Sequence, residues 1–257
     1  MLLKLIDFLQ TNKFLHFFTN SFLLFNFRTK KGGKNKLLGY LSGLSIKSSV
    51  KLKGRSNTVE FKSGYRLDKS KIYVRGNNNK IIINENSKVI SSLIWIIGDN
   101  NVLTLGQDNV VYNTEIGLEY SDNKIKTHKK VLIGGFVQLG RIKNNTSMVC
   151  IYACEGKKIE LQKGVCVSDG VCMRTSDSHP IYNNTGERIN YPEDINVGEN
   201  VWIGSKASLL KGAGVGDNSI IAYRGLVTKD FSDNSNVILA GSPAKILKEE
   251  IKWELFF

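Results

Sequence analysis

The sequence predicts an all-β protein built as a solenoid of parallel strands. Its 257 residues include 24 glycines and only three prolines, which suits many short strands joined by tight turns. A 22-residue repeat fills much of the first half of the chain, and a six-residue repeat fills much of the second half. Self-similarity at fixed periods indicates stacked units that bury their apolar faces against one another.

The first 44 residues differ from the rest, and we expect an N-terminal helical segment there. Seven phenylalanines occur by residue 27, and a basic run follows from Arg28 to Lys36. Polar residues such as Asp7 and His16 interrupt the apolar stretch well short of a bilayer span, and no small-residue cleavage site follows. An amphipathic helix with a basic tail can lie on an anionic membrane or cap the open end of the solenoid, and both interpretations stay open.

Residues 45–160 are predicted to form irregular solenoid coils of 22 residues. Three segments align without gaps, starting at Val50, Ile72 and Ile94, and a degenerate fourth copy begins at Ile116. Apolar residues two apart describe short strands with one face inward, and a Gly/Asn corner separates them. We expect a hydrogen-bonded ladder of side-chain amides along one corner, formed by Asn57, Asn79, Asn101 and Asn123.

A stricter repeat occupies residues 161–241. The aliphatic residues that recur every six positions are Val197, Ile203, Leu209, Val215, Ile221 and Val227. This period excludes an amphipathic helix, whose apolar face recurs at about 3.6 residues, and fits a triangular coil of three hexapeptides. Leu161, Val167 and Met173 share the frame, which breaks at a loop over residues 175–196. A short C-terminal helix is expected within residues 242–257.

The formal net charge of +13 predicts a negatively charged partner, such as nucleic acid, an anionic membrane or an acidic substrate. No zinc finger, RNA-binding strand motif or Walker loop is present, so we expect no nucleic-acid partner. The four cysteines lack the paired spacing of structural zinc sites, so we expect reduced thiols and no metal. Within the hexad frame, Cys166 and Cys172 fall on adjacent faces of one coil and should point apart.

The loop over residues 175–196 is the candidate catalytic loop. Loops on rigid scaffolds concentrate catalytic residues, and "SDSHP" places His179 at the start of this one. Imidazole, with a pKa near neutrality, can take the proton of a hydroxyl nucleophile. The other histidines compete poorly, because His16 lies in the Phe-rich segment and His128 lies among lysines. Asp177 and Glu187 are candidates to orient the imidazole, and the sequence does not rank them.

The segment "VWIG…LLKGAGVGDNSIIAYRGLVTKD…LAGSPAKIL" resembles the C-terminal signature of hexapeptide-repeat acyltransferases, which fold as left-handed parallel β-helices. Together with "TSDSHPI…GERIN" and the 22-residue repeats, residues 45–253 more narrowly resemble bacterial O-acetyltransferases of capsular or other surface polysaccharides, some of which act on sialic acid. The resemblance implies direct transfer of acetyl from acetyl-CoA to a hydroxyl of an acidic polysaccharide. It further implies a cytoplasmic homotrimer with active sites between subunits, and residues 1–40 suit peripheral attachment at the inner membrane face.

The resemblance also implies roles for individual residues. His179 is the general base, and Trp202 forms the wall of the site near the acetyl thioester. The expected contacts to coenzyme A are Trp202, Gly204, Ala222, Thr228, Lys229 and Lys245. The expected contacts to the acceptor are Arg174, Asp177, Arg188 and Tyr223. Leu210, Thr228, Tyr223 and Arg224 depart from the small residues that the family pattern usually has, so contacts near the pantetheine slot are expected to differ.

Two other functions stay open at this point. A sugar N-acetyltransferase of the same fold would direct the same groups at an amine. A non-catalytic scaffold docked at the membrane would use the Phe-rich segment but leave the histidine loop unexplained. A zinc carbonic anhydrase on this solenoid would need several histidine ligands, and the hexad half contains one histidine, His179. The sequence gives neither the acceptor sugar and its modified hydroxyl nor the handedness of the 22-residue coils.

Overall fold

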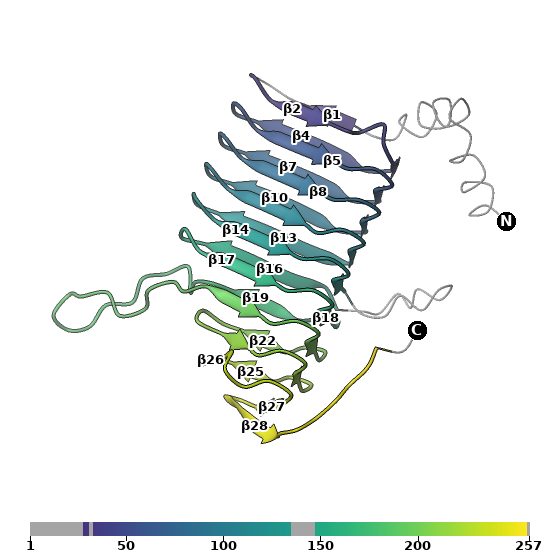
Figure 1. Ribbon diagram of the computed structural model, residues 1–257. Coiled ribbons are helices and arrows are strands. Elements are labelled where there is room, and N and C mark those ends of the chain that lie inside the picture. Colours follow the sequence, from purple (N-terminus) through teal and green to yellow (C-terminus); the bar gives the residue numbers. More distant parts are fainter. Residues whose placement is uncertain (1–27, 31–32, 135–146, 256–257) are drawn as a thin grey trace.

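The protein is a triangular solenoid of parallel strands in the computed structural model, which describes residues 28–30, 33–134 and 147–255 (Figure 1). Three sheets of nine, nine and ten strands run along its axis, and we name them A, B and C. Each coil adds one strand to each sheet in turn. The described residues contain no helix, which confirms the all-β prediction. They therefore hold no helix that could cross a membrane.

Sheet A consists of β1 (Arg28–Lys30), β4 (Ser49–Lys53), β7 (Lys71–Arg75), β10 (Leu93–Ile97), β13 (Thr114–Glu119), β16 (Val149–Cys154), β19 (Cys172–Arg174), β22 (Ser208–Leu209) and β25 (Leu226–Val227). Sheet B consists of β2 (Lys36–Leu38), β5 (Thr58–Phe61), β8 (Lys80–Ile83), β11 (Val102–Leu105), β14 (Lys124–Thr127), β17 (Lys158–Leu161), β20 (Ile195–Val197), β23 (Gly214–Val215) and β26 (Asp230–Phe231). Sheet C consists of β3 (Leu44–Ile46), β6 (Arg66–Asp68), β9 (Lys88–Ile90), β12 (Val110–Tyr112), β15 (Leu132–Ile133), β18 (Cys166–Val167), β21 (Trp202–Ile203), β24 (Ile220–Ile221), β27 (Ile238–Gly241) and β28 (Ala244–Lys248).

The strand register confirms the repeat columns. Val50 pairs with Ile72 and Ile72 with Ile94, and Ile116 continues the column in the degenerate copy. These side chains point inward and are buried, so the core is a continuous stack of aliphatic residues inside the triangle. The register offset between neighbouring coils is 22 residues in these coils and falls to 18 between β21 and β24, where Trp202 pairs with Ile220. The C-terminal coils are therefore shorter than the N-terminal ones.

The asparagine ladder lies at the corner between sheets A and B, as predicted. Asn79 Nδ2 donates to Asn57 Oδ1 at 2.9 Å, and Asn101 Nδ2 donates to Asn79 Oδ1 at 3.0 Å. Asn123 Nδ2 continues the series to Asn101 Oδ1 at 2.8 Å. Each Oδ1 also accepts the backbone N–H of the next asparagine, so every buried amide joins two coils. The ladder satisfies polar groups that water cannot reach.

The two ends of the chain differ from the sequence prediction. The expected C-terminal helix is wrong: β28 pairs antiparallel with β27, and residues 249–255 continue without a helix. The exposed edge of β27 offers unpaired backbone groups, and pairing with them outweighs the helical propensity of the tail. At the other end, residues 1–27 lie outside the described residues. Arg28–Lys30 and Lys36–Leu38 are strands, so the first coil begins before the expected boundary at residue 44.

Candidate active site

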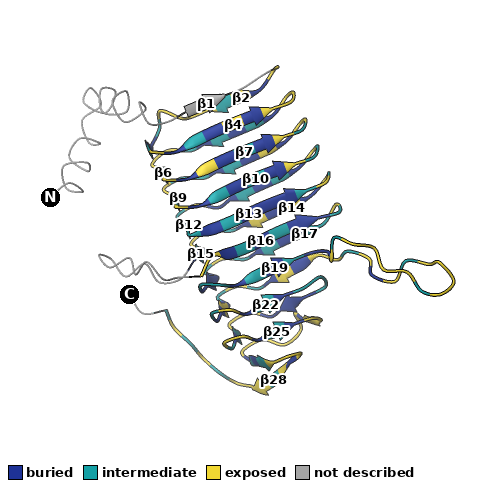
Figure 2. Cartoon of the chain, turned by 180° about the vertical axis from the view of Figure 1, so that it is seen from behind, coloured by how far each residue is buried: buried dark blue, intermediate teal, exposed yellow. Residues whose placement is uncertain are grey.

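An arm of residues 175–194 leaves the solenoid between β19 and β20, at the corner between sheets A and B (Figure 1). Its two limbs meet at an antiparallel bridge between Tyr182 and Arg188. Asn183 shapes the turn, because its Oδ1 accepts the backbone N–H groups of Thr185 at 3.0 Å and Glu187 at 2.9 Å. Figure 2 shows that most of the arm is exposed. The predicted break in the hexad frame is therefore a projecting loop.

One ion pair anchors the base of the arm to the coil before it. Arg188 Nη1 lies 2.8 Å from Glu155 Oε2, and Arg188 Nη2 donates to Glu155 Oε1 at 3.2 Å. The hydroxyl of Ser176 donates to the same carboxylate. These hydrogen bonds, that of Arg188 above all, lower the pKa of Glu155. The carboxylate therefore stays ionised near neutral pH and ties both limbs of the arm to the solenoid.

A second network anchors the arm to the coil after it. Lys211 Nζ lies 2.5 Å from Asp177 Oδ2. Asn190, which is buried, donates from Nδ2 to Asp177 Oδ2 and to the backbone carbonyl of His179, both at 2.8 Å. The hydrogen bond from Lys211 is the main reason why the pKa of Asp177 is lowered. This network fixes the backbone on both sides of the histidine.

The imidazole of His179 is exposed and has no hydrogen-bond partner within the described part of the chain. Asp177 is engaged by Lys211 and Asn190, and Glu187 lies in the turn of the arm, where its Oε2 accepts a hydrogen bond from Asn183 Nδ2 at 3.4 Å. Neither carboxylate orients the ring in this chain. The hydrogen bonds around His179 therefore fix the position of its backbone, and its ring nitrogens are available to another molecule.

Trp202 lies in β21 on sheet C, with 37% of its surface exposed. Its Nε1 donates to Ser168 Oγ at 3.0 Å, which sets the orientation of the ring. The ring of Trp253 in the C-terminal segment lies against it, with centroids 6.1 Å apart and planes at 41°. Trp253 Nε1 in turn donates to the backbone carbonyl of Asn200 at 2.9 Å. The C-terminal segment thus contacts the tryptophan that the sequence singled out.

The predicted site residues fall into two groups on different sides of the solenoid. The group at the corner between sheets A and B comprises Arg174, Asp177, His179, Arg188, Thr228 and Lys229. The group on sheet C or at its corner with sheet A comprises Trp202, Gly204, Ala222, Tyr223 and Lys245. In a three-sided solenoid, sheet C lies opposite the corner between the other two sheets. A single chain therefore does not bring the two groups together.

The second group offers a narrow backbone surface edged by polar side chains. Gly204 is buried, and a Cβ there would lie 2.6 Å from the carbonyl oxygen of Ile221, so glycine permits the close approach of successive coils. Ala222 presents only a methyl group beside it. Tyr223 is 58% exposed, and Lys245 is exposed on β28. In the first group, Lys229 is exposed and its ammonium lies 5.0 Å from the ring centre of Phe231.

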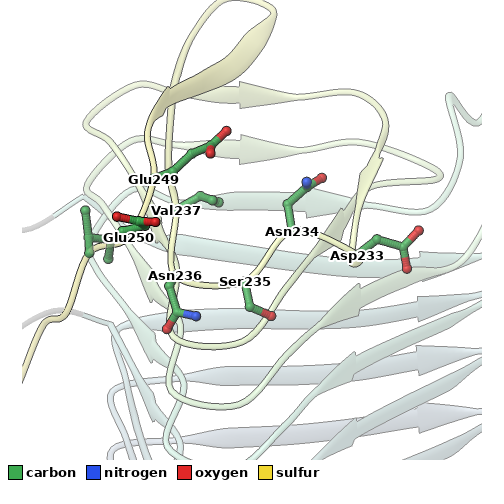
Figure 3. Close-up of a pocket in the computed structure, with 8 residues that line it drawn as sticks. Asp233, Asn234, Ser235, Asn236, Val237, Glu249 and Glu250 are labelled. Carbon is green, nitrogen blue, oxygen red and sulfur yellow. The ribbon is translucent and has the colours of Figure 1, made fainter.

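A hollow of about 500 Å³ lies beside the last coils, at the corner between sheets B and C (Figure 3). Its lining residues are Asp233, Asn234, Ser235, Asn236, Val237, Glu249, Glu250 and Ile251. Three carboxylates on this surface would repel the phosphates of a nucleotide. The hollow therefore does not suit a coenzyme, and we place no site there.

Sequence reasoning missed the residues that anchor the arm. These are Glu155, Ser176, Asn190 and Lys211. Glu155 and Lys211 lie in neighbouring coils, 33 residues from Arg188 and 34 from Asp177, and no local pattern marks such partners. The separation of the cysteines was predicted correctly: Cys166 lies in sheet C and Cys172 in sheet A, and all four cysteines are free thiols.

No family model matches the chain. Its fold is that of the hexapeptide-repeat β-helix acetyltransferases, as two solved structures show. The polysialic-acid-specific acetyltransferase NeuO overlays with a TM-score of 0.64 and 26% identity over 90% of each chain. The polysialic acid O-acetyltransferase OatWY overlays with a TM-score of 0.67 and 26% identity, over 90% of this chain and 92% of that one.

Sequence similarity to curated proteins points the same way over shorter stretches. The polysialic acid O-acetyltransferase of Escherichia coli O1:K1 / APEC is 36% identical over 88 residues, which is 34% of this chain and 28% of that protein. The galactoside O-acetyltransferase of Escherichia coli K12 is 39% identical over 74 residues, 28% of this chain and 34% of that protein. The alignments span between 28% and 47% of the lengths of the first curated relatives.

Proposed function

We propose that the protein is an acetyl-CoA-dependent O-acetyltransferase that acts on an acidic, capsular type of bacterial polysaccharide. The observation that carries the proposal is the exposed imidazole of His179, held through its backbone at the base of an arm that projects from the solenoid. A histidine so placed is suited to act on a molecule outside its own coil. The similarity to O-acetyltransferases of polysialic acid and galactosides supports the reaction class.

The active enzyme in this proposal is a homotrimer with sites between subunits. The arm exposes apolar side chains, with Ile181 at 52% and Ile189 at 59%, and such a surface favours a protein partner. A neighbouring copy that covers the arm with its sheet C side would supply Trp202 to His179. The two groups of predicted residues, apart in one chain, would then form one site.

The chemistry follows from the residues on the two sides. His179 accepts the proton of the acceptor hydroxyl while that oxygen forms a bond to the acetyl carbonyl carbon. The carbon–sulfur bond breaks, and the imidazolium returns its proton to the departing thiolate. Backbone N–H groups near Trp202 supply hydrogen bonds to the negative oxygen. Gly204 and Ala222 leave room for the pantetheine arm, and the cations of Lys229 and Lys245, with Thr228, suit its phosphates.

An acidic acceptor fits the basic groups at the arm. Arg174 and Arg188 are partly exposed at the base of the arm, so their positive charge can attract a carboxylate. Asp177 and Tyr223 complete the proposed acceptor contacts. Capsule precursors are built at the inner face of the cytoplasmic membrane, and we place the enzyme in the cytoplasm there. Residues 1–40 would provide peripheral attachment.

Thiol release from acetyl-CoA tests this proposal. We would compare wild type, His179→Ala and the matched histidine variant His128→Ala, with polysialic acid, neutral polysaccharides and an amino sugar as acceptors. We expect release that depends on a polysaccharide, falls at least about 100-fold in His179→Ala and persists in His128→Ala. His128 is a suitable control because it directly follows β14, and its Nε2 lies 2.8 Å from Glu160 Oε1.

Each other result would contradict a defined part of the proposal. Full activity of His179→Ala would show that His179 is not the general base. Transfer to the amino sugar alone would identify an N-acetyltransferase. If coenzyme A did not bind, the non-catalytic scaffold would be the favoured function.

A further inference from the structure

An outward-facing column of side chains runs along sheet A from the N-terminal coils to the arm. The strand register places six residues in it: Lys51, Tyr73, Trp95, Gly117, Tyr152 and Arg174. We call these residues the outer column. Strands in a sheet are about 4.8 Å apart, so its five steps extend over about 24 Å. Its five side chains are exposed or partly exposed, whereas Gly117 is buried.

The rings in the outer column are held in place. Trp95 Nε1 donates to Glu115 Oε1 at 2.7 Å. The rings of Trp95 and Tyr152 have centroids 6.0 Å apart at 43°, and they meet over Gly117. A Cβ on Gly117 would lie 2.4 Å from the Trp95 ring and 2.8 Å from the Tyr152 ring. Glycine there therefore lets the two rings form one surface across three strands.

Cations lie at both ends of the outer column. Lys51 Nζ lies 5.8 Å from the ring centre of Tyr73, and the Arg174 guanidinium lies 5.7 Å from that of Tyr152. Lys53, Lys71 and Arg75 surround the N-terminal end and are exposed. The carboxylates of Glu115 and Glu119 lie near the middle, so negative groups of a ligand are best placed at the ends.

The outer column ends at the arm. Arg174 is its last member and the last residue of β19, and its Nη2 donates to Ser178 Oγ at 2.8 Å. Ser178 immediately precedes His179. A chain lying along the column would therefore lead to the base of the arm, at the corner where the proposed base lies.

We propose that the outer column is a binding surface for the acceptor polysaccharide chain, several sugar units away from the acetylated hydroxyl. The inference rests on the proposed function for the identity of its ligand. Aromatic faces pack against the C–H faces of sugar rings, and fixed rings lose little entropy on binding. Lys51, Lys71 and Arg75 attract the carboxylates of an acidic polymer, while Glu115 accepts hydrogen bonds from hydroxyls.

Direct binding in the inactive His179→Ala background tests the outer column without requiring turnover. We would measure dissociation constants for polysialic acid, hyaluronate and polygalacturonate, with dextran as the neutral polymer and a sialic acid dimer as the short ligand. We expect one or more acidic polymers to bind. Tyr73→Ala and Trp95→Ala should each weaken that binding about tenfold and leave the dimer unaffected. Tyr73→Phe, which keeps the ring, should bind like the parent.

The matched control is Tyr112→Ala, which removes a half-buried outward tyrosine from sheet C. It should leave polymer binding unchanged, and thermal unfolding would verify that each variant folds. Unchanged polymer binding in both Tyr73→Ala and Trp95→Ala would overturn the inference, as would failure of every acidic polymer to bind. Dissociation of the trimer in Trp95→Ala would identify the column as a subunit contact instead. Polymer binding through the column without acetyl transfer by wild type would refute only the proposed function.

Discussion

Asn101 shows how single residues hold successive coils together. Its amide is fully buried, and it donates to Asn79 Oδ1 at 3.0 Å and to the carbonyl of Tyr120 at 2.9 Å. Its Oδ1 accepts from both the backbone and the side chain of Asn123. A buried polar group that loses its partner is destabilised by about 1–3 kcal/mol. One side chain therefore protects groups in three coils.

We expect Asn101→Ala to lower the free energy of unfolding by about 3 kcal/mol, because the Tyr120 carbonyl and the Asn123 N–H lose their partners inside the solenoid. Denaturant unfolding would measure the change. Asn77→Ala removes an exposed amide from the same corner and should cost less than about 1 kcal/mol. Equal losses of unfolding free energy for the two variants would show that the asparagine ladder stabilises the protein no more than an exposed amide at the same corner does.

At the scale of elements, Glu160 joins β14 to β17 on the outer face of sheet B. Its carboxylate accepts hydrogen bonds from His128 Nε2 at 2.8 Å, Lys158 Nζ at 3.1 Å and Lys126 Nζ at 3.2 Å. These bonds, that of His128 above all, lower its pKa from 4.5 to about 2. A lowered pKa means that the unfolded chain binds the proton more readily, so stability is lost as the pH falls.

We therefore expect Glu160→Gln to be less stable than wild type at pH 7 and to lose less stability on acidification. The contribution of the carboxylate is present above about pH 4.5 and disappears as the pH approaches 2. Thermal unfolding from pH 7 to pH 2 would show the two midpoints converging. A constant difference across this range would assign the effect to packing rather than to charge.

Sequence patterns predicted the elements better than the contacts between them. Val50, Ile72 and Ile94 reveal their shared column because identical spacing places them on one inward face. The predicted C-terminal helix was wrong. The composition of the tail favours a helix, and no sequence pattern indicates that the edge of β27 is available for pairing. His179 was singled out through its loop and motif, and its role as the base stays a prediction. The partners of the arm, such as Glu155, were not found because charge pairs between distant segments leave no periodic signal.

At the scale of the whole molecule, the separation of His179 from Trp202 has a direct consequence for assembly. In the proposed homotrimer, mixing His179→Ala and Trp202→Ala chains, each expected to be inactive alone, pairs an intact histidine with an intact tryptophan at some sites. In every trimer that contains both variants, one of the three sites should be restored, because each site draws its two residues from different chains. Coexpression with two affinity tags, followed by activity assays of the doubly tagged trimers, would measure this recovery.

No recovery in properly assembled mixed trimers would show that His179 and Trp202 do not form one site between subunits and would contradict the proposed arrangement. The separately expressed variants, each checked for assembly and thermal stability, supply the baseline. Because Trp202 also contacts Trp253, Trp202→Phe would be the second tryptophan variant if the alanine change disturbs the C-terminal segment.

The constant register of the 22-residue coils makes the length of the solenoid easy to alter. Each coil contacts mainly its two neighbours, so duplication of one coil in the gene would add a strand to every sheet and disturb only the joint. The outer column would grow by about 4.8 Å, while the arm and its anchors would stay as they are. On our proposal, a single duplication would then change how long a stretch of polymer the enzyme holds, and natural selection could vary that length independently of the chemistry.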